Sequence, residues 1–218
     1  MAIVTPAAGS PLAASELAAR LGSAVRGEVH TSTLRRAEYS TDASNYRVVP
    51  QAVVVPLDVD DLLAVVEVAL DTRTPLTLRG GGTSVAGNAI GTGIVVDTSR
   101  HLRGIGQIDQ ADRTAFVEPG VVMSELQAAA KPYGLRFGPD PSTQNRATLG
   151  GMIGNNACGP HAVAYGRTAD NVVALDVVDG RGRRFTAGSG AGALDVVPGL
   201  AALVADNLDV IRTELGRF

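Results

Sequence analysis

A run of short apolar segments between residues 52 and 97 sets the strongest limit on the fold of this chain. The segment AVVVP at 52–56 is short and apolar throughout, which is typical of a strand buried on both faces. Asp58 then stands where a helix cap is expected, with Asp61 three residues on. One helical face follows, formed by Leu62, Leu63, Val66, Ala69 and Leu70. The segments PLTLRG and GIVVD add two strands, so a βαβ unit with parallel pairing is predicted.

Beyond Asp97 the alternation of strand and helix gives way to a different pattern. Residues 101–120 are typical of two strands joined near Gln110 to Asp112, and residues 121–134 of a helix that begins near Gly120 and closes at Gly134. The segment 171–188 predicts a hairpin turning at Asp179-Gly180. The last 20 residues have the spacing of an amphipathic helix. Near the N-terminus, Ser10-Pro11 predicts the start of a short helix that Gly22 closes.

Three consecutive glycines occupy residues 80–82, directly after a predicted strand. Common phosphate loops end in Lys-Ser or Lys-Thr, and the dinucleotide fingerprint G-x-G-x-x-G opens a helix. The segment LRGGGTSVAGN at 78–88 has neither feature. Two interpretations stay open here. One is an ordinary turn. The other is a nest of backbone N–H groups, flanked by the hydroxyls of Thr83 and Ser84, that holds a pyrophosphate without lysine or Mg²⁺.

A second glycine-rich stretch, residues 137–171, favours the nest. It contains Pro-Asp-Pro, Thr-Leu-Gly-Gly, Gly-Asn-Asn and Tyr-Gly in succession. We expect little regular structure between residues 138 and 166, and so long a loop inside a compact domain is usually functional. Two such loops can clamp one ligand from two sides. A flat ligand with a phosphate tail, such as a flavin dinucleotide, fits that arrangement.

The segments RGGGTSVAGNA, PDPSTQNRATLGGMIGNNACG and YGRTADNVVALDVV together resemble the FAD-binding domain of the vanillyl-alcohol oxidase and p-cresol methylhydroxylase flavoproteins. Within that family they are most similar to FAD-linked D-lactate and glycolate dehydrogenases, some of which carry a downstream iron–sulfur region. The resemblance implies an α+β fold with two FAD-binding subdomains. It implies a helical lead-in at 1–34, a small parallel βαβ subdomain at 35–110, and a mixed or antiparallel sheet with flanking helices at 111–218, incomplete at its C-terminal end.

The resemblance also implies how the two loops share the cofactor. The pyrophosphate would be wrapped by Arg79, Gly80, Gly81, Gly82, Thr83 and Ser84, and that wall would continue with Gly87 and Asn88. The loop beside the flavin would be lined by Pro139, Asp140, Ser142, Thr143 and Thr148. The isoalloxazine and ribityl chain would run along Gly150, Gly151, Gly154, Asn155, Asn156 and Ala157, and that side would be closed by Tyr165 and Gly166. Asp42, Asn45 and Tyr46 stay open between a flavin contact and a surface loop.

The function implied is oxidation of a D-2-hydroxy acid such as D-lactate or glycolate, with hydride transfer from the α-carbon to the flavin. An alternative is a flavin-binding electron-transfer subunit without its own substrate site. We assign no catalytic residue, because this chain has no Arg–His–Glu constellation that could bind a carboxylate and take a proton, and we expect it to be inactive alone. An iron–sulfur group or a quinone is the expected electron acceptor. FAD is expected to be non-covalent, because Thr83 and Ser84 stand where covalent members place a nucleophile.

The net charge and the cysteine content argue against several other kinds of partner and site. The net charge of −3 argues against nucleic-acid or anionic-membrane partners. No apolar stretch reaches the roughly 18 residues that a membrane span needs. A cytoplasmic location is expected, or one at the inner face of the membrane. The single cysteine, Cys158, excludes an intrachain disulfide, and Cys158 with His161 gives only two candidate ligands, too few for a zinc site. We therefore assign no metal.

Overall fold

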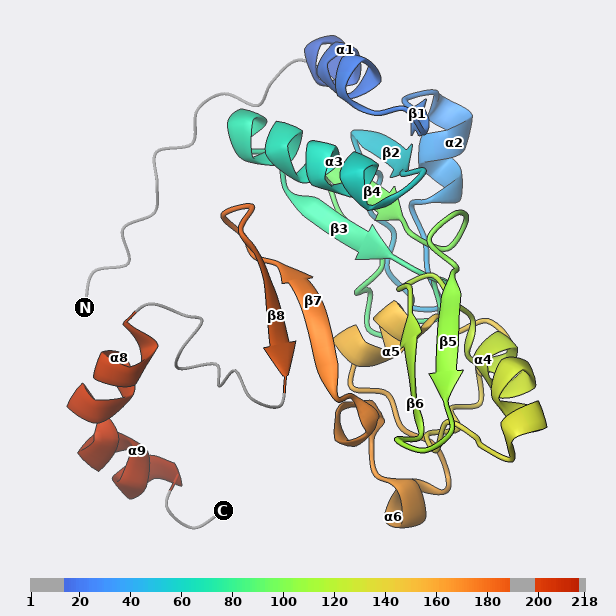
Figure 1. The fold of residues 1–218 in the computed structure, drawn as a ribbon. Helices are drawn as coiled ribbons and strands as arrows, with labels where there is room; N and C mark the ends of the chain where they lie inside the picture. The colour runs from blue at the N-terminus through green and yellow to red at the C-terminus, as the bar shows by residue number, and fades with distance from the viewer. Residues whose placement is uncertain (1–13, 189–198, 216–218) are drawn as a thin grey trace. The chain divides into compact units, whose positions relative to one another are not determined.

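The apolar segment at 52–55 forms strand β2 (Ala52–Val55) inside a four-stranded sheet of order β1-β2-β4-β3 (Figure 1). Strand β4 (Ile94–Asp97) lies between β2 and β3 (Leu76–Arg79) and is parallel to both. Strand β1 (Glu28–His30) pairs antiparallel with β2. The predicted parallel βαβ unit is confirmed, and β4 is inserted between the two strands that the crossover helix connects.

The computed structural model describes residues 14–188 and 199–215. They belong to two compact units, residues 1–171 and 172–218. The expected boundaries at residues 34 and 110 stay predictions. Helix α1 (Ala14–Ala24) runs through Gly22, so the expectation that this glycine ends the helix is wrong. Ser10 and Pro11 lie outside the described residues.

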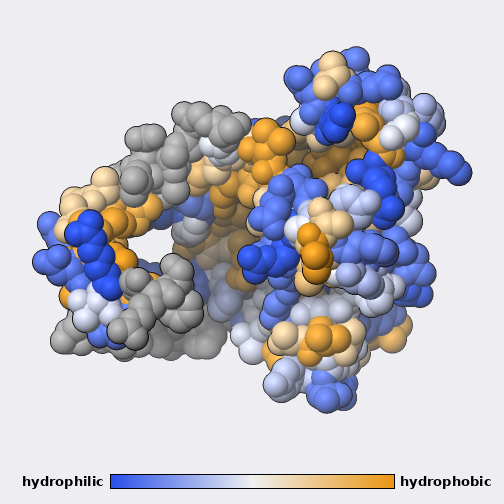
Figure 2. Space-filling model, turned by 90° about the horizontal axis from the view of Figure 1, so that it is seen from below, coloured by the Kyte–Doolittle hydropathy of each residue, from blue (hydrophilic) through white to orange (hydrophobic). Residues whose placement is uncertain are grey.

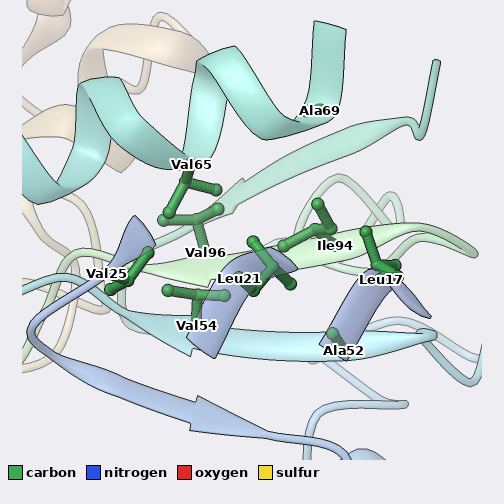
Figure 3. Close-up of a cluster of buried hydrophobic side chains, with 9 residues drawn as sticks. All are labelled: Leu17, Leu21, Val25, Ala52, Val54, Val65, Ala69, Ile94 and Val96. Carbon is green, nitrogen blue, oxygen red and sulfur yellow. The ribbon is translucent and has the colours of Figure 1, made fainter. Parts of the chain in front are cut away.

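Side chains of the central strands alternate between two buried faces, as the unbroken apolar sequence predicted. Figure 3 shows Ala52, Val54, Ile94 and Val96 pointing toward α1 and α3 (Val59–Thr72), where they pack against Leu17, Leu21, Val25, Val65 and Ala69. The intervening residues Val53, Val55 and Val95 are also buried. Burial on both faces holds the sheet in place. It thereby also fixes the point at which strand β3 ends and the glycine loop begins.

Helix α3 begins at Asp58 as predicted, and the Asp58 carboxylate accepts the Asp61 N–H at 3.0 Å. Its buried stripe differs from the predicted one. Asp61, Val65 and Ala69 are buried, whereas Leu70 is exposed. The helix is turned so that Asp61, a residue the apolar pattern did not include, faces inward.

The reason is a set of hydrogen bonds to the Asp61 carboxylate. It accepts the backbone N–H groups of Arg26 at 3.0 Å, Gly27 at 2.8 Å and Leu57 at 2.9 Å, while its residue is only 2% exposed. Burial raises the pKa of Asp61, but these hydrogen bonds together with the Arg26 guanidinium outweigh it and hold that pKa below its usual range. Asp61 thus fastens the α1–β1 turn to the start of α3.

A second core supports the other half of the larger unit. The hairpin β5 (Ile105–Asp109) and β6 (Thr114–Val117), helix α4 (Met123–Ala130) and the turn η1 (Lys131–Tyr133) follow in order. The hairpin is as predicted, and Gly134 ends the helical segment with φ +70°, whereas the helix cap is Val122 and not Gly120. Buried Val121, Met123, Leu126, Ala147, Leu149 and Met152 form this core.

Residues 138–166 are more regular than predicted. They contain α5 (Leu149–Gly154) and α6 (Ala162–Tyr165), and the turn η2 (Thr168–Asn171) follows. Thr148 caps α5, because its side chain accepts the Gly151 N–H at 3.3 Å. Gly150, Gly151 and Gly154 argued against a helix here in the sequence, because glycine is unfavourable in helix interiors. Helix α2 (Thr33–Glu38) precedes an irregular loop.

The smaller unit contains the predicted hairpin, β7 (Ala174–Val178) and β8 (Arg184–Gly188), with its turn at Asp179. The terminal amphipathic segment is two helices, α8 (Leu200–Asp206) and α9 (Leu208–Leu215). Large apolar side chains on them are exposed, including Leu203 and Leu215, and Figure 2 shows apolar and hydrophilic side chains mixed on this segment, at the left. Among the described residues, no helix is both long and apolar enough to cross a bilayer.

We predict that Asp61→Asn lowers the free energy of unfolding by about 2 kcal/mol, because an amide NH₂ would face backbone donors and leave one unpaired. The wild-type advantage should be present above the pKa of an unfolded carboxyl and be lost as pH falls through the lower pKa of folded Asp61. Urea denaturation as a function of pH measures both. Asp60→Asn, at an exposed position in the same helical turn, is the control. Equal stability of the two variants at neutral pH would contradict the role of Asp61.

Candidate functional site

The two glycine-rich loops meet at one cavity of about 250 Å³. It lies beyond the carboxyl end of β3, the side of a parallel sheet at which ligands usually bind. The first loop contributes Gly80, Gly81, Gly82, Thr83, Ser84, Val85, Ala86 and Asn88, preceded by Leu78. The second contributes Thr143, Ala147, Thr148, Gly151, Met152, Asn155 and Ala157. Segments about 60 residues apart in sequence thus form opposite walls of one site.

The triple glycine is required by close packing between the loops. A Cβ atom at Gly80 would overlap the Thr148 hydroxyl, and one at Gly81 would overlap the Arg146 carbonyl oxygen. Gly82 has φ +66°, a conformation that side chains rarely adopt. The first loop therefore lies directly against the second, on the Thr148 side chain and the Arg146 backbone, which an ordinary exposed turn would not need.

A row of backbone donors runs along the first loop. Within the part of the chain that the structure describes, no acceptor pairs with the N–H groups of residues 80–85. The next donors are paired, since Ser84 Oγ accepts from Ala86 N at 3.2 Å and Asn88 N at 3.3 Å. Successive free N–H groups on a concave wall attract anions. The described lining of this cavity has no ionisable side chain, so such an anion would be held by backbone dipoles, hydroxyls and amides.

Side chains of the second loop fix the opposite wall. Thr148 is buried at the start of α5, and its hydroxyl holds the Gly151 N–H. Asn88 Nδ2 donates to Asn155 Oδ1 at 2.6 Å, and Asn155 Nδ2 donates to the Gly151 oxygen at 3.0 Å. The Asn88–Asn155 bond joins the two loops directly and sets the width of the cavity between them.

A second cavity of about 360 Å³ adjoins the first. Both are lined by Gly81, Gly82, Thr83 and Thr143, and the second adds Arg79, Arg146, Glu38, Thr41, Asp42 and Ala43. Asp42 thus lines a cavity, whereas Tyr46 is 63% exposed and packs its ring against Gly87. Burial raises the pKa of Asp42, but hydrogen bonds from Ser44 and Ala89 outweigh it and lower that pKa overall.

Other residues predicted for the site lie in the same loops without lining either cavity. They are Gly87, Pro139, Asp140, Ser142, Gly150, Gly154, Asn156, Tyr165 and Gly166. Several shape the second loop instead. Asn156, with φ +47°, accepts the Ala169 N–H at 3.0 Å, and Arg136 lies over the Tyr165 ring at 5.3 Å.

Asp140 contacts His161 through both its carboxylate oxygens and ties two parts of the second loop together. That histidine holds the pKa of Asp140 below its usual range. Cys158 is exposed. Among residues 14–188 and 199–215, no three His, Cys, Asp or Glu side chains gather closely enough to hold a metal ion.

Some lining residues carried no signal in the sequence. Leu78, Val85, Ala147 and Met152 are apolar neighbours of the glycines and have no distinctive chemistry. Thr41 and Ala43 come from a loop far upstream, and only the fold brings them to the site. Arg146 lies inside the predicted second loop. It could be assigned to the cavity only from its backbone contact with Gly81, which the sequence does not reveal.

Comparison with known proteins agrees with this geometry. Residues 50–188 match the FAD binding domain family. D-2-hydroxyglutarate dehydrogenase of Pseudomonas putida is 41% identical over 181 residues, 82% of this chain and 18% of that protein. Glycolate oxidase subunit GlcD of Bacillus subtilis is 36% identical over 149 residues, 67% of this chain and 32% of that protein. The chain therefore spans less than a third of the length of these curated relatives.

Solved structures show the same fold. An alkyldihydroxyacetonephosphate synthase superimposes with a TM-score of 0.72 at 21% identity, covering 84% of this chain and 37% of that one. The expected α+β fold of the p-cresol methylhydroxylase type is confirmed. The family match covers more than half of the residues and includes both glycine-rich loops. The chain belongs to the FAD binding domain family.

Proposed function

We propose that this chain is the FAD-binding part of a flavin-dependent enzyme that oxidises a D-2-hydroxy acid. The observation that carries the proposal is the cavity between the two loops, with unpaired N–H groups along residues 80–85 on one wall. A dinucleotide brings two phosphates that need donors and flat rings that need close approach. A wall of backbone amides offers both, because no side chain stands between ligand and donor.

The residues present fit such a group in shape as well as in chemistry. The two cavities share the wall of Gly81, Gly82 and Thr83, so an extended ligand can follow that wall from one cavity to the other. Apolar Leu78, Val85 and Met152 suit a ring system. The amides of Asn88 and Asn155 suit polar ring edges or the ribityl hydroxyls.

We propose that attachment is non-covalent. The described linings of both cavities contain no histidine, cysteine or tyrosine that could bond to the flavin. Thr83 and Ser84 hydroxyls are poor nucleophiles without an adjacent base. No ionisable side chain lines the first cavity among the described residues, and the two carboxylates that line the second cavity with Thr83 already accept hydrogen bonds, Glu38 from Arg35 and Asp42 from Ser44 and Ala89.

The residues that line the two cavities indicate which part of the reaction this chain would perform. Bound FAD would supply the hydride acceptor, while this chain's residues bind and orient it and keep water from part of it. The substrate class comes from relatives whose names specify D-2-hydroxyglutarate and glycolate. In this proposal, groups that hold the hydroxy acid and take its proton belong to regions of such longer proteins outside the aligned residues. An iron–sulfur group or a quinone would then accept the electrons.

Gly81→Ala should weaken FAD binding at least tenfold, about 1.4 kcal/mol, because the added Cβ overlaps the Arg146 carbonyl oxygen and the loops must separate. Fluorescence titration with FAD measures the affinity. Gly22→Ala is the matched control, since a Cβ there meets nothing within 4 Å. Equal FAD affinity in both variants would contradict the proposed site.

The enzymatic role can be tested by grafting. We expect a chimera in which this chain replaces the aligned segment of the Pseudomonas putida dehydrogenase to bind FAD and to reduce it when D-2-hydroxyglutarate is added. The isolated chain, loaded with FAD, should show no such reduction. Acid precipitation of either loaded protein should leave all flavin in the supernatant. A folded chimera whose bound FAD is not reduced by any 2-hydroxy acid would favour the electron-transfer alternative. Flavin retained in the pellet would contradict non-covalent attachment.

A further inference from the structure

We infer that Arg79 is a positioning residue, which holds the glycine loop in its binding shape from within and does not itself contact the phosphates. The inference rests on the proposed FAD site and specifies how that site is built. It differs from the expectation that Arg79 joins the loop glycines in wrapping the pyrophosphate.

The guanidinium of Arg79 is already engaged by the protein. Its Nη1 donates to the Thr41 oxygen at 2.9 Å and to the Ala89 oxygen at 3.1 Å. Its Cζ atom lies over the Tyr39 ring, 5.2 Å from the ring centre. Arg79 ends β3 and Ala89 lies at the far end of the glycine loop, so one side chain ties the end of the loop to its beginning.

The loop is wrapped around this side chain. A Cβ at Gly82 would lie 2.6 Å from Arg79 Nη2, so the absence of a side chain at Gly82 leaves room for the guanidinium. Two further bonds hold the loop to the same upstream segment. Ala43 N donates to the Gly82 oxygen at 3.1 Å, and Ala89 N donates to Asp42 Oδ2 at 3.3 Å.

Tyr39 gives this arrangement a rigid base. Its hydroxyl donates to Asp97 Oδ2 at 2.6 Å, and Asp97 is only 5% exposed at the end of β4. Burial, followed by the hydrogen bond to Asp97, raises the pKa of Tyr39 to about 12, so the ring stays a neutral phenol. A neutral aromatic face attracts a guanidinium. The sheet therefore supports Tyr39, Tyr39 supports Arg79, and Arg79 supports the loop.

A direct phosphate contact would require Arg79 to give up these partners. Both carbonyl oxygens would lose their donor, and the ring would lose the cation above it. Lysine cannot reproduce this geometry, because its single ammonium nitrogen would have to reach both carbonyl oxygens and lie over the Tyr39 ring at once, whereas the guanidinium places Nη1 at the carbonyls and Cζ over the ring. The two roles therefore predict different behaviour for Arg79→Lys.

Hydrogen exchange without FAD gives the first test. If Arg79 positions the loop, then Arg79→Lys and Arg79→Gln should each speed exchange about tenfold at the hydrogen-bonded amides of Ala86, Asn88 and Ala89. Tyr39→Leu, at a residue that lines neither cavity, should do the same. Unchanged exchange in these variants would overturn the inference, and this result does not depend on FAD binding.

FAD titration across a range of salt concentrations gives the second test. Positioning predicts that Arg79→Lys and Arg79→Gln both weaken binding about tenfold, although lysine keeps the charge, and that adding Tyr39→Leu causes little further loss. Wild-type affinity in Arg79→Lys, with a flatter salt dependence in Arg79→Gln, would overturn the inference in favour of phosphate contact. Arg103→Gln removes one exposed charge elsewhere, paired with Glu125, and is the control. A wild-type chain that fails to bind FAD would contradict the proposed function instead, leaving the exchange result to decide the role of Arg79.

Discussion

Close packing between the two glycine-rich loops is the constraint on which the site depends. Gly80 and Gly81 lie against Thr148 and Arg146 so closely that no side chain fits between them. The contact brings the N–H groups of the first loop into one wall of a cavity and the start of α5 into the other. Absence of side chains thus serves two purposes, because it allows the loops to meet and leaves the donors open to a ligand.

Two separate cores hold these loops at the required distance. The first, between the parallel sheet and helices α1 and α3, fixes the end of β3 from which the glycine loop leaves. The second, around Met123, Leu149 and Met152, fixes α5. Because the cavity walls come from different cores, small movements between them would change its width. The Asn88–Asn155 hydrogen bond opposes such movement.

Sequence reasoning succeeded where one local signal acts alone and was wrong where distant contacts decide. Unbroken apolar strands, the Asp58 cap and the hairpins follow from nearest neighbours, and they were predictable. The rotation of α3 was not, because it depends on Asp61 reaching the Arg26–Gly27 turn, over 30 residues away. Helix α5 was missed because its glycines weaken helical propensity, while tertiary packing of Leu149 and Met152 stabilises it. The sequence indicated that the two glycine-rich loops come together, and both line one cavity, but the engagement of Arg79 with Thr41, Ala89 and Tyr39 needed the fold.

The central claim is that backbone N–H groups of the first loop hold the phosphates of a dinucleotide, and amide NMR tests it most directly. The ¹⁵N-labelled chain would be titrated with FAD and, separately, with ADP, which carries the same adenosine diphosphate unit. The account predicts that amide protons within residues 80–85 shift downfield with both ligands, as expected for new hydrogen bonds to phosphate oxygens. Saturable binding of FAD that leaves these amide resonances unchanged would contradict it.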